Sequence, residues 1–294
     1  MIQKNNLDST INEPLLENPQ HGGSEVEHAA TLYAEPVFSI GNYHVTNALL
    51  TSTISVFIIV LMSILIKANI KKVPGKFQAF FETILEGALS LADQVTGSRK
   101  KTQKVFPLVI AIFFFVLINN WIGILPFGAF GLLEKGNEGL SFVPFLRSGT
   151  ADINTTIGLA LMAVLGSNIF GIFSIGVWKT LNKYVNLKAL GHMITKVRHD
   201  PTILLVAPIM FFVGILELIG EAAKVASLSF RLFGNVFAGE VLLGSMAALL
   251  AYILPVPFLF LEVFVGLIQA LIFSMLTLVY FTIASEDHDE EHHE

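Results

Sequence analysis

The longest apolar stretch of the chain is residues 201–254, PTILLVAPIMFFVGILELIGEAAKVASLSFRLFGNVFAGEVLLGSMAALLAYIL. As one helix, these 54 residues would be ~80 Å long, more than twice the ~30 Å of hydrocarbon in a bilayer. Asp200 followed by Pro201 is typical of a helix start. Two separate crossings would turn residues 217–240 into a loop, and that sequence is too apolar for one. We therefore expect a single, steeply tilted helix.

Composition places the whole chain among membrane proteins. Of its 294 residues, 53% are apolar and 14% charged, and the mean hydropathy is +0.69. The net charge of −5 disfavours nucleic acid as a partner. There is no cysteine, and the P-loop, HExxH and GxSxG motifs are missing. We expect no cofactor, no metal site and no enzymatic activity of the chain on its own.

Four further segments have the length and apolarity of membrane-crossing helices. They are residues 48–66, 105–125, 153–178 and 258–284. Residues 77–95 instead alternate apolar and acidic positions at helical spacing, which predicts an amphipathic helix along the membrane interface. The predicted fold class is an all-α polytopic membrane protein with about five crossing helices and one interfacial helix.

The distribution of charge predicts three regions and an orientation. Residues 1–45 form a polar segment without the pattern of a cleaved signal peptide, 46–285 the membrane domain, and 286–294 an acidic tail. The linkers 67–104 and 179–198 carry 8 and 5 Lys/Arg and should lie on the cytoplasmic side. The opposite side carries Lys4, Lys135 and Arg147. This puts the amino terminus outside and the carboxy terminus inside.

Ionisable residues within the long apolar segment are the candidate functional groups. Each charge at mid-bilayer costs roughly 2.5–3.5 kcal/mol, so such residues default to ion pathways or paired sites. Glu217, Glu221, Lys224, Leu228, Arg231 and Asn235 step by four and three residues and form one helical stripe, with Ser227 one turn before Arg231. Glu240 lies nine residues after Arg231, which is half a turn beyond whole turns. Arg231 and Glu240 should therefore face different surfaces.

The last crossing helix adds a second polar face. Glu262 and Gln269 are seven residues apart and share one side of the helix. Because Glu262 has no cation within a turn or two in sequence, it is a candidate proton-relay group.

Structural interpretations stay open for several of these residues. Glu217, Glu221 and Lys224 could form an ion network without a transport role. Glu240 could be an interfacial carboxylate, and Arg231 could reach the membrane surface. The asparagines are more often interhelical hydrogen-bond partners than pore lining; they are Asn119, Asn120 and Asn168. A disordered acidic tail is favoured over a metal tract for the last histidines; they are His288, His292 and His293.

Residues 227–240, SLSFRLFGNVFAGE, resemble the hallmark of subunit a of F-type ATP synthases. The similarity consists of an arginine, then Leu-Phe-Gly-Asn, and a polar residue nine positions after the arginine. It continues in residues 269–280 (QALIFSMLTLVY) and 151–155 (ADINT), and the order of spans fits from about residue 36 to 285.

This resemblance implies a stator subunit beside a rotating c-ring, with b-type peripheral stalk subunits and membrane lipid as further partners. Arg231 would be the essential arginine that makes each ring carboxylate release its proton and prevents a direct leak between two offset half-channels. The implied proton path is Glu240, Glu262, Asn235 and Gln269. Polar positions of lesser importance would be Lys224, Ser227, Glu217, Glu221 and Asp152. Many relatives have a histidine at one of the two path carboxylates, whereas this chain has none there.

The resemblance further implies ATP synthesis in an energy-transducing membrane, and we expect the bacterial plasma membrane. H+ rather than Na+ is the expected ion, although ring residues outside this chain would decide selectivity. The alternative function is a stand-alone secondary transporter in which Arg231 binds an anionic or proton-coupled substrate. Such transporters usually contain two related halves, and we find no internal repeat. A purely structural scaffold would leave Arg231, Glu240 and Glu262 unexplained.

Overall fold

The computed structural model describes residues 33–71, 73–124, 131–136, 139–178, 180, 203–250 and 253–285. Five of the described helices are long and apolar enough to cross a membrane. They are α1 (Asn47–Asn69), α3 (Arg99–Ile124), α4 (Ile153–Ile175), α7 (Ile203–Leu249) and α8 (Pro255–Ala284). A sixth, α2 (Lys76–Thr96), is amphipathic in sequence. The predicted fold class, an all-α polytopic membrane protein, is confirmed.

The helix ends follow from local sequence. Thr46 caps α1, since its hydroxyl accepts the Leu49 N–H at 3.3 Å. Helix α2 ends at Gly97, which adopts the left-handed conformation with φ 65°. Helix α8 begins with Pro255 at its first position. The helix start predicted at Asp200 lies outside the described residues.

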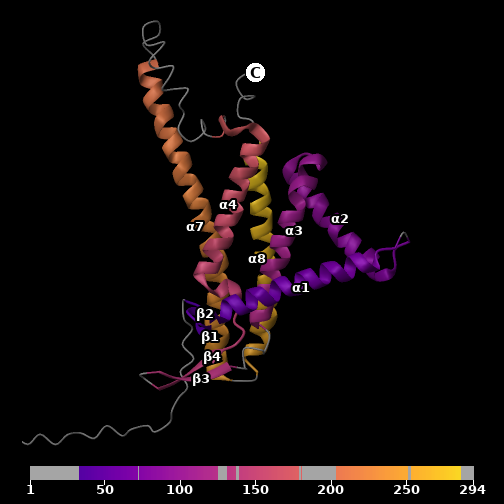
Figure 1. The fold of residues 1–294 in the computed structure, drawn as a ribbon, viewed down its shortest axis with the longest axis vertical. Coiled ribbons are helices and arrows are strands. Elements are labelled where there is room, and N and C mark those ends of the chain that lie inside the picture. The colour runs from indigo at the N-terminus through magenta and orange to yellow at the C-terminus, as the bar shows by residue number, and fades with distance from the viewer. Residues whose placement is uncertain are drawn as a thin grey trace, which may run out of the picture.

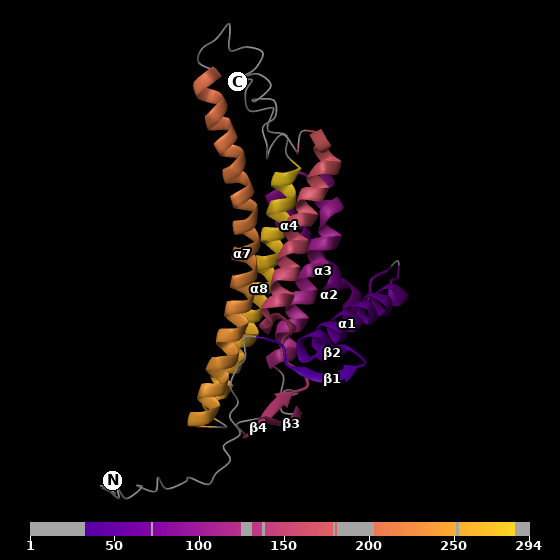
Figure 2. The same cartoon turned by 60° about the vertical axis from the view of Figure 1, so that its left-hand side comes forward.

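Helix α7 is one unbroken helix of 47 described residues. At ~1.5 Å per residue it is ~70 Å long, and Figures 1 and 2 show it inclined to α8, so that the two helices diverge towards the start of α7. The prediction of a single helix is therefore confirmed, while its tilt within the membrane stays a prediction. Its length exposes surface that no other described helix covers.

Helices α3, α4, α7 and α8 form the bundle, and α8 packs against the other three (Figure 1). Helix α1 leaves this bundle at a wide angle, and α2 returns from its far end towards the start of α3 (Figures 1 and 2). Only the first turns of α1 are buried, at Asn47, Ala48, Thr51 and Ser55. The rest of α1 is an uncovered apolar helix, as expected of a surface that faces lipid.

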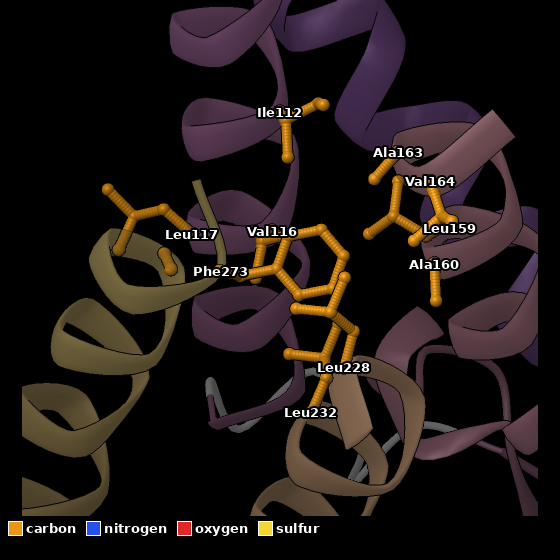
Figure 3. Packing of buried hydrophobic residues seen from close by; sticks show 11 residues of the cluster. Ile112, Val116, Leu117, Leu159, Ala160, Ala163, Val164, Leu228, Leu232 and Phe273 are labelled. Atoms are coloured by element: carbon orange, nitrogen blue, oxygen red, sulfur yellow. The ribbon is translucent and has the colours of Figure 1, made fainter. Parts of the chain in front are cut away.

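The bundle core lies where α3, α4, α7 and α8 meet. Figure 3 shows the ring of Phe273 from α8 between Val116 of α3 and Leu228 of α7, all three almost completely buried. Ala160 and Ala163 of α4 have small side chains, which let the helix backbones approach closely. The same face of α7 contributes Leu232, so this packing fixes which side of α7 remains open. A second cluster joins α2, α3 and α8; it consists of Ala92, Val105, Val109, Leu278 and Phe281.

Two β-hairpins were not predicted. One pairs β1 (Pro36–Ile40) with β2 (Tyr43–Thr46), and the other pairs β3 (Gly131–Gly136) with β4 (Gly139–Pro144). The first hairpin lies largely within residues 1–45, which were predicted only as a polar segment, and no element was predicted for the second. Strands this short carry too few alternating positions to be distinguished from loop sequence. Figure 1 shows both hairpins at the same end of the bundle, beside the turn that joins α7 to α8.

Truncating the core should destabilise the bundle. Leu228 is 1% exposed and Ile219, on the same helix, is 58% exposed. Leu228→Ala should therefore cost about 2–5 kcal/mol through lost contacts and a cavity, whereas Ile219→Ala should cost little. Thermal unfolding of the purified protein in detergent measures both. Equal midpoints for the two variants would contradict this assignment of the core.

Candidate functional site

Arg231 lies on the open side of α7. Its side chain is exposed, as are Ser227, Gly234 and Ala238 at helical spacing around it. A Cβ added at Gly234 would meet no atom within 4 Å. Among the described residues, Arg231 has no hydrogen-bond or ion-pair partner, and its charge acts on the Tyr280 hydroxyl of α8. A guanidinium thus sits beside α8 on a face of small residues that the described bundle leaves uncovered.

The stripe predicted from Glu217 to Asn235 follows the edge between the packed and open faces of α7. Leu228 is buried in the core and Arg231 is exposed, while Glu217, Glu221 and Asn235 are partly buried. These residues share one helical side as predicted, but their environments differ because α7 is inclined across its neighbours.

Glu221 and Lys224 form the ion network that the sequence left open. Lys224 Nζ donates to Glu221 Oε1 at 2.7 Å, and Asn168 Nδ2 of α4 donates to Glu221 Oε2 at 3.1 Å. Lys224 Nζ also lies 5.2 Å from the centroid of the Tyr280 ring, within the range of a cation–π interaction. These contacts tie α7 to α4 and α8 on the side of Arg231 opposite to Glu240.

Glu240 has an ion-pair partner from a distant part of the chain. Arg147, which precedes the short 3-10 helix η2 (Gly149–Ala151), donates from Nε to Glu240 Oε1 at 2.8 Å and from Nη2 to Oε2 at 2.7 Å. Arg147 Nη1 also donates to the backbone carbonyl of Tyr33 at 3.1 Å. The prediction counted Arg147 only as a loop charge. The structure also places Arg231 and Glu240 on different sides of α7, because Glu240 turns towards this loop.

Glu262 lies against the same part of α7. The space that a Cβ of Gly239 would need is occupied by the Glu262 carboxylate, so only glycine permits this approach. Glu262 is partly buried and has no ion-pair or hydrogen-bond partner among the described residues. Glu262 of α8 therefore contacts α7 at Gly239, the residue that precedes Glu240, the other predicted path carboxylate.

Asn235 of α7 and Gln269 of α8 lie between the two carboxylates and Arg231, as measured along the helix axes. Gly239 faces Glu262, and the two helices run in opposite directions, so Asn235 and Gln269 lie ~6 Å and ~10 Å further along in the same direction. Measured from Gly239 in the same direction, Arg231 lies ~12 Å along α7. The amide nitrogens Asn235 Nδ2 and Gln269 Nε2 are buried without a partner in the described part of the chain. These two N–H donors are therefore free to hydrogen-bond to a polar group, such as a water molecule, that enters the site.

Asp152 and the asparagines have structural roles. Asp152 is the N-cap of α4, since its carboxylate accepts the Asn154 N–H and the Thr155 hydroxyl at 3.3 and 3.1 Å. Asn120 Nδ2 donates to the Gly266 carbonyl at 3.2 Å, and Asn119 Oδ1 accepts the Ser52 hydroxyl at 3.4 Å. With the Asn168 contact described above, the interpretation of these asparagines as interhelical hydrogen-bond partners is confirmed. The tail histidines lie outside the described residues.

Most of the chain matches a known family. A family model described as "ATP synthase A chain" matches residues 49–282, which include all five of the candidate membrane helices for most of their length. The chain belongs to the ATP synthase A chain family. The resemblance drawn from residues 227–240 is thereby confirmed, and the chain is a multi-pass membrane protein of ATP synthesis and ion transport.

Three similar proteins are each named as an ATP synthase subunit a. The chain is similar to "ATP synthase subunit a" of Mycobacterium bovis, with 34% identity over 253 residues that cover 84% of the chain and 90% of the relative. It is 36% identical to "ATP synthase subunit a, sodium ion specific" of Propionigenium modestum over 213 residues, 72% of the chain and 64% of the relative. It is 32% identical to "ATP synthase subunit a, chloroplastic" of Oedogonium cardiacum over 279 residues, 94% of the chain and 96% of the relative.

Three contributors to the site were missed from sequence: Arg147, Gly239 and Tyr280. Arg147 is 93 positions from Glu240, and no local pattern indicates that pairing. Gly239 has no local signature, because its contact with Glu262 comes from another helix. Tyr280 lay inside the stretch that carries the family resemblance, but its position beside Lys224 and Arg231 depends on the α7–α8 packing.

A side chain at Gly239 should disturb the Glu262 carboxylate. Gly239→Ala places a Cβ where that carboxylate lies, whereas Gly158→Ala on α4 meets nothing within 4 Å. We expect Gly239→Ala to slow ATP-driven ion pumping in membrane vesicles and Gly158→Ala to leave it near the wild-type rate. Pumping rates are compared per assembled complex, determined by immunoblot. A Gly239→Ala variant as fast as Gly158→Ala would show that the Glu262 position is not needed.

Proposed function

We propose that this chain is the ion-conducting stator subunit of a rotary ATP synthase. In this proposal Arg231 meets carboxylates carried past it by a c-ring, and two offset half-channels connect that meeting point to the two sides of the membrane. The observation that carries the proposal is the exposed Arg231 guanidinium, without an ion-pair partner among the described residues, on a small-residue face of a long apolar helix. A charge in that position requires a partner from outside the described bundle.

Arginine suits a guard role because it stays protonated at any physiological pH. It can attract a carboxylate and lower its affinity for a proton without itself passing a proton on. The small residues around it, Ser227, Gly234 and Ala238, let a neighbouring helix approach closely. The inclination of α7 relative to α8 supports the proposal, because an inclined helix presents a long face to a curved ring.

The entry path is assigned to the hairpin end of the bundle. Glu240 and Glu262 lie at that end, and the unpartnered amide nitrogens of Asn235 and Gln269 lie between them and the level of Arg231. The exit path is assigned to the opposite direction along α7, past Ser227 and Lys224 towards Glu217. Glu240 and Arg231 lie on different faces of α7. In this proposal the two paths are therefore separate, and only a ring carboxylate carries the proton from one path to the other.

The proposed partners are the c-ring, b-type peripheral stalk subunits and membrane lipid. We propose H+ as the transported ion, although the relative from Propionigenium modestum is named sodium ion specific. The proposed location is the bacterial plasma membrane, with the amino terminus extracytoplasmic and the carboxy terminus cytoplasmic, which follows from the excess of Lys and Arg in the two linkers.

Removing the guanidinium tests the proposal. Arg231→Ala should abolish ATP-driven proton pumping in membrane vesicles while the complex still assembles, because ring carboxylates would no longer be made to release protons. Arg99→Ala, which removes an exposed arginine near the α2–α3 turn, is the matched control and should pump at a rate close to wild type. Normal pumping by the Arg231→Ala variant would refute the proposed function.

A further inference from the structure

The contact between Arg147 and Glu240 joins three distant parts of the chain. Arg147 is only 5% exposed, and its guanidinium contacts both oxygens of Glu240 through Nε and Nη2. Its third nitrogen, Nη1, donates to the carbonyl of Tyr33. A bidentate contact of this kind is strong and holds the carboxylate in one position and orientation. Glu240 is therefore held by the α3–α4 connection, which is itself tied to the N-terminal segment.

The backbone on which Arg147 sits is braced by buried hydrogen bonds. The Ser148 hydroxyl donates to the Asn119 carbonyl at 3.2 Å, and the Thr150 hydroxyl donates to Asn120 Oδ1 at 2.6 Å. At Gly149, any Cβ would collide with the side chains of Asn119 and Ser52, so the connection packs directly on α1 and α3. Arg147 thus approaches Glu240 from a rigid support and not from a freely moving loop.

The two carboxylates at this end of α7 have unequal surroundings. Glu240 has the Arg147 cation, whereas Glu262, adjacent to it across Gly239, has no cationic partner among the described residues. The groups that α1 and α3 contribute nearby are neutral: Ser52, Asn119 and Asn120. The N-terminal segment contributes the backbone carbonyl of Tyr33 and also carries the carboxyl of Glu35, whose backbone N–H donates to Asn47. Of these two carboxyls, only Glu240 is paired with a cation among the described residues, so Glu262 is the one left without an opposite charge.

We propose that Arg147 is a positioning residue of the entry path, which holds Glu240 in a fixed ion pair and leaves Glu262 as the group that takes up and releases the proton. This inference rests on the proposed function and assigns different roles to two residues of the same path. Glu240 then supplies a fixed negative charge beside the path, and Glu262 carries the ion. Arg147 acts through Glu240 and does not itself exchange protons.

The test is a double-mutant cycle in the complete ATP synthase, with Arg147→Gln, Glu240→Gln and the double variant. Arg147→Gln leaves Glu240 without its cation, which is more damaging than removing both charges. We expect the Arg147→Gln variant to pump about tenfold more slowly than wild type, and the double variant to recover to within about threefold, a coupling typical of contacting residues. A double variant that pumps no faster than Arg147→Gln would overturn the proposal.

The dependence of the pumping rate on pH distinguishes the proposed role of Arg147 from a purely structural one. Wild type and the double variant should each show one titrating group on the entry side, and Arg147→Gln should show a second, because its Glu240 is free to bind a proton. An Arg147→Gln profile with the wild-type shape would contradict the proposal. Rates are again expressed per assembled complex.

If Arg147→Gln does not assemble, Glu240→Gln compared with Glu262→Gln decides the question. Glu240→Gln should keep at least about a third of the wild-type rate, since a fixed charge contributes to the path without carrying the ion, and Glu262→Gln should lose far more. Equal losses would overturn the proposal. Arg231→Ala is measured in the same membranes: if it pumps normally the proposed function fails, whereas an inactive Arg231→Ala with an unrescued double variant refutes only the role of Arg147.

Discussion

A guanidinium on an apolar helix face has to find a partner, because an isolated charge in hydrocarbon costs several kcal/mol. Elsewhere in α7 the chain provides that partner itself: Lys224 pairs with Glu221, and Arg147 pairs with Glu240. Arg231 is different, since no described residue forms an ion pair with it. In the proposed function another subunit completes the surface around Arg231, and the rest of the fold can be understood as presenting that surface.

Packing determines which side of α7 is presented. Leu228 and Leu232 are buried against Phe273 and the small residues of α4, so the turn that carries Arg231 cannot rotate without opening the core. The polar groups of α7 are also separated along its length. Glu221 and Lys224 lie on one side of Arg231, and Glu240 lies on the other. The guard role proposed for Arg231 requires this separation, and one continuous inclined helix provides it.

Much of this arrangement could be predicted from periodicity and length. Hydropathy predicted the helices, and the half-turn between Arg231 and Glu240 follows from ~100° per residue. The cap at Asp152 also has a local signature. Arg147 could not be found in this way, because it meets Glu240 across 93 positions and only the packed loop brings them together. The same holds for Gly239, whose missing side chain matters only because Glu262 arrives from another helix.

The most direct measurement is cysteine cross-linking in the assembled ATP synthase, since the chain contains no cysteine of its own. Ser227→Cys is one turn from Arg231 on the open face of α7, and Met162→Cys is a comparably exposed position on α4. With a second cysteine beside the ring carboxyl, Ser227→Cys should form a disulfide to the ring under mild oxidation and Met162→Cys should not. Cross-linking from position 162 and none from position 227 would contradict the account, because Arg231 would then face away from the rotor.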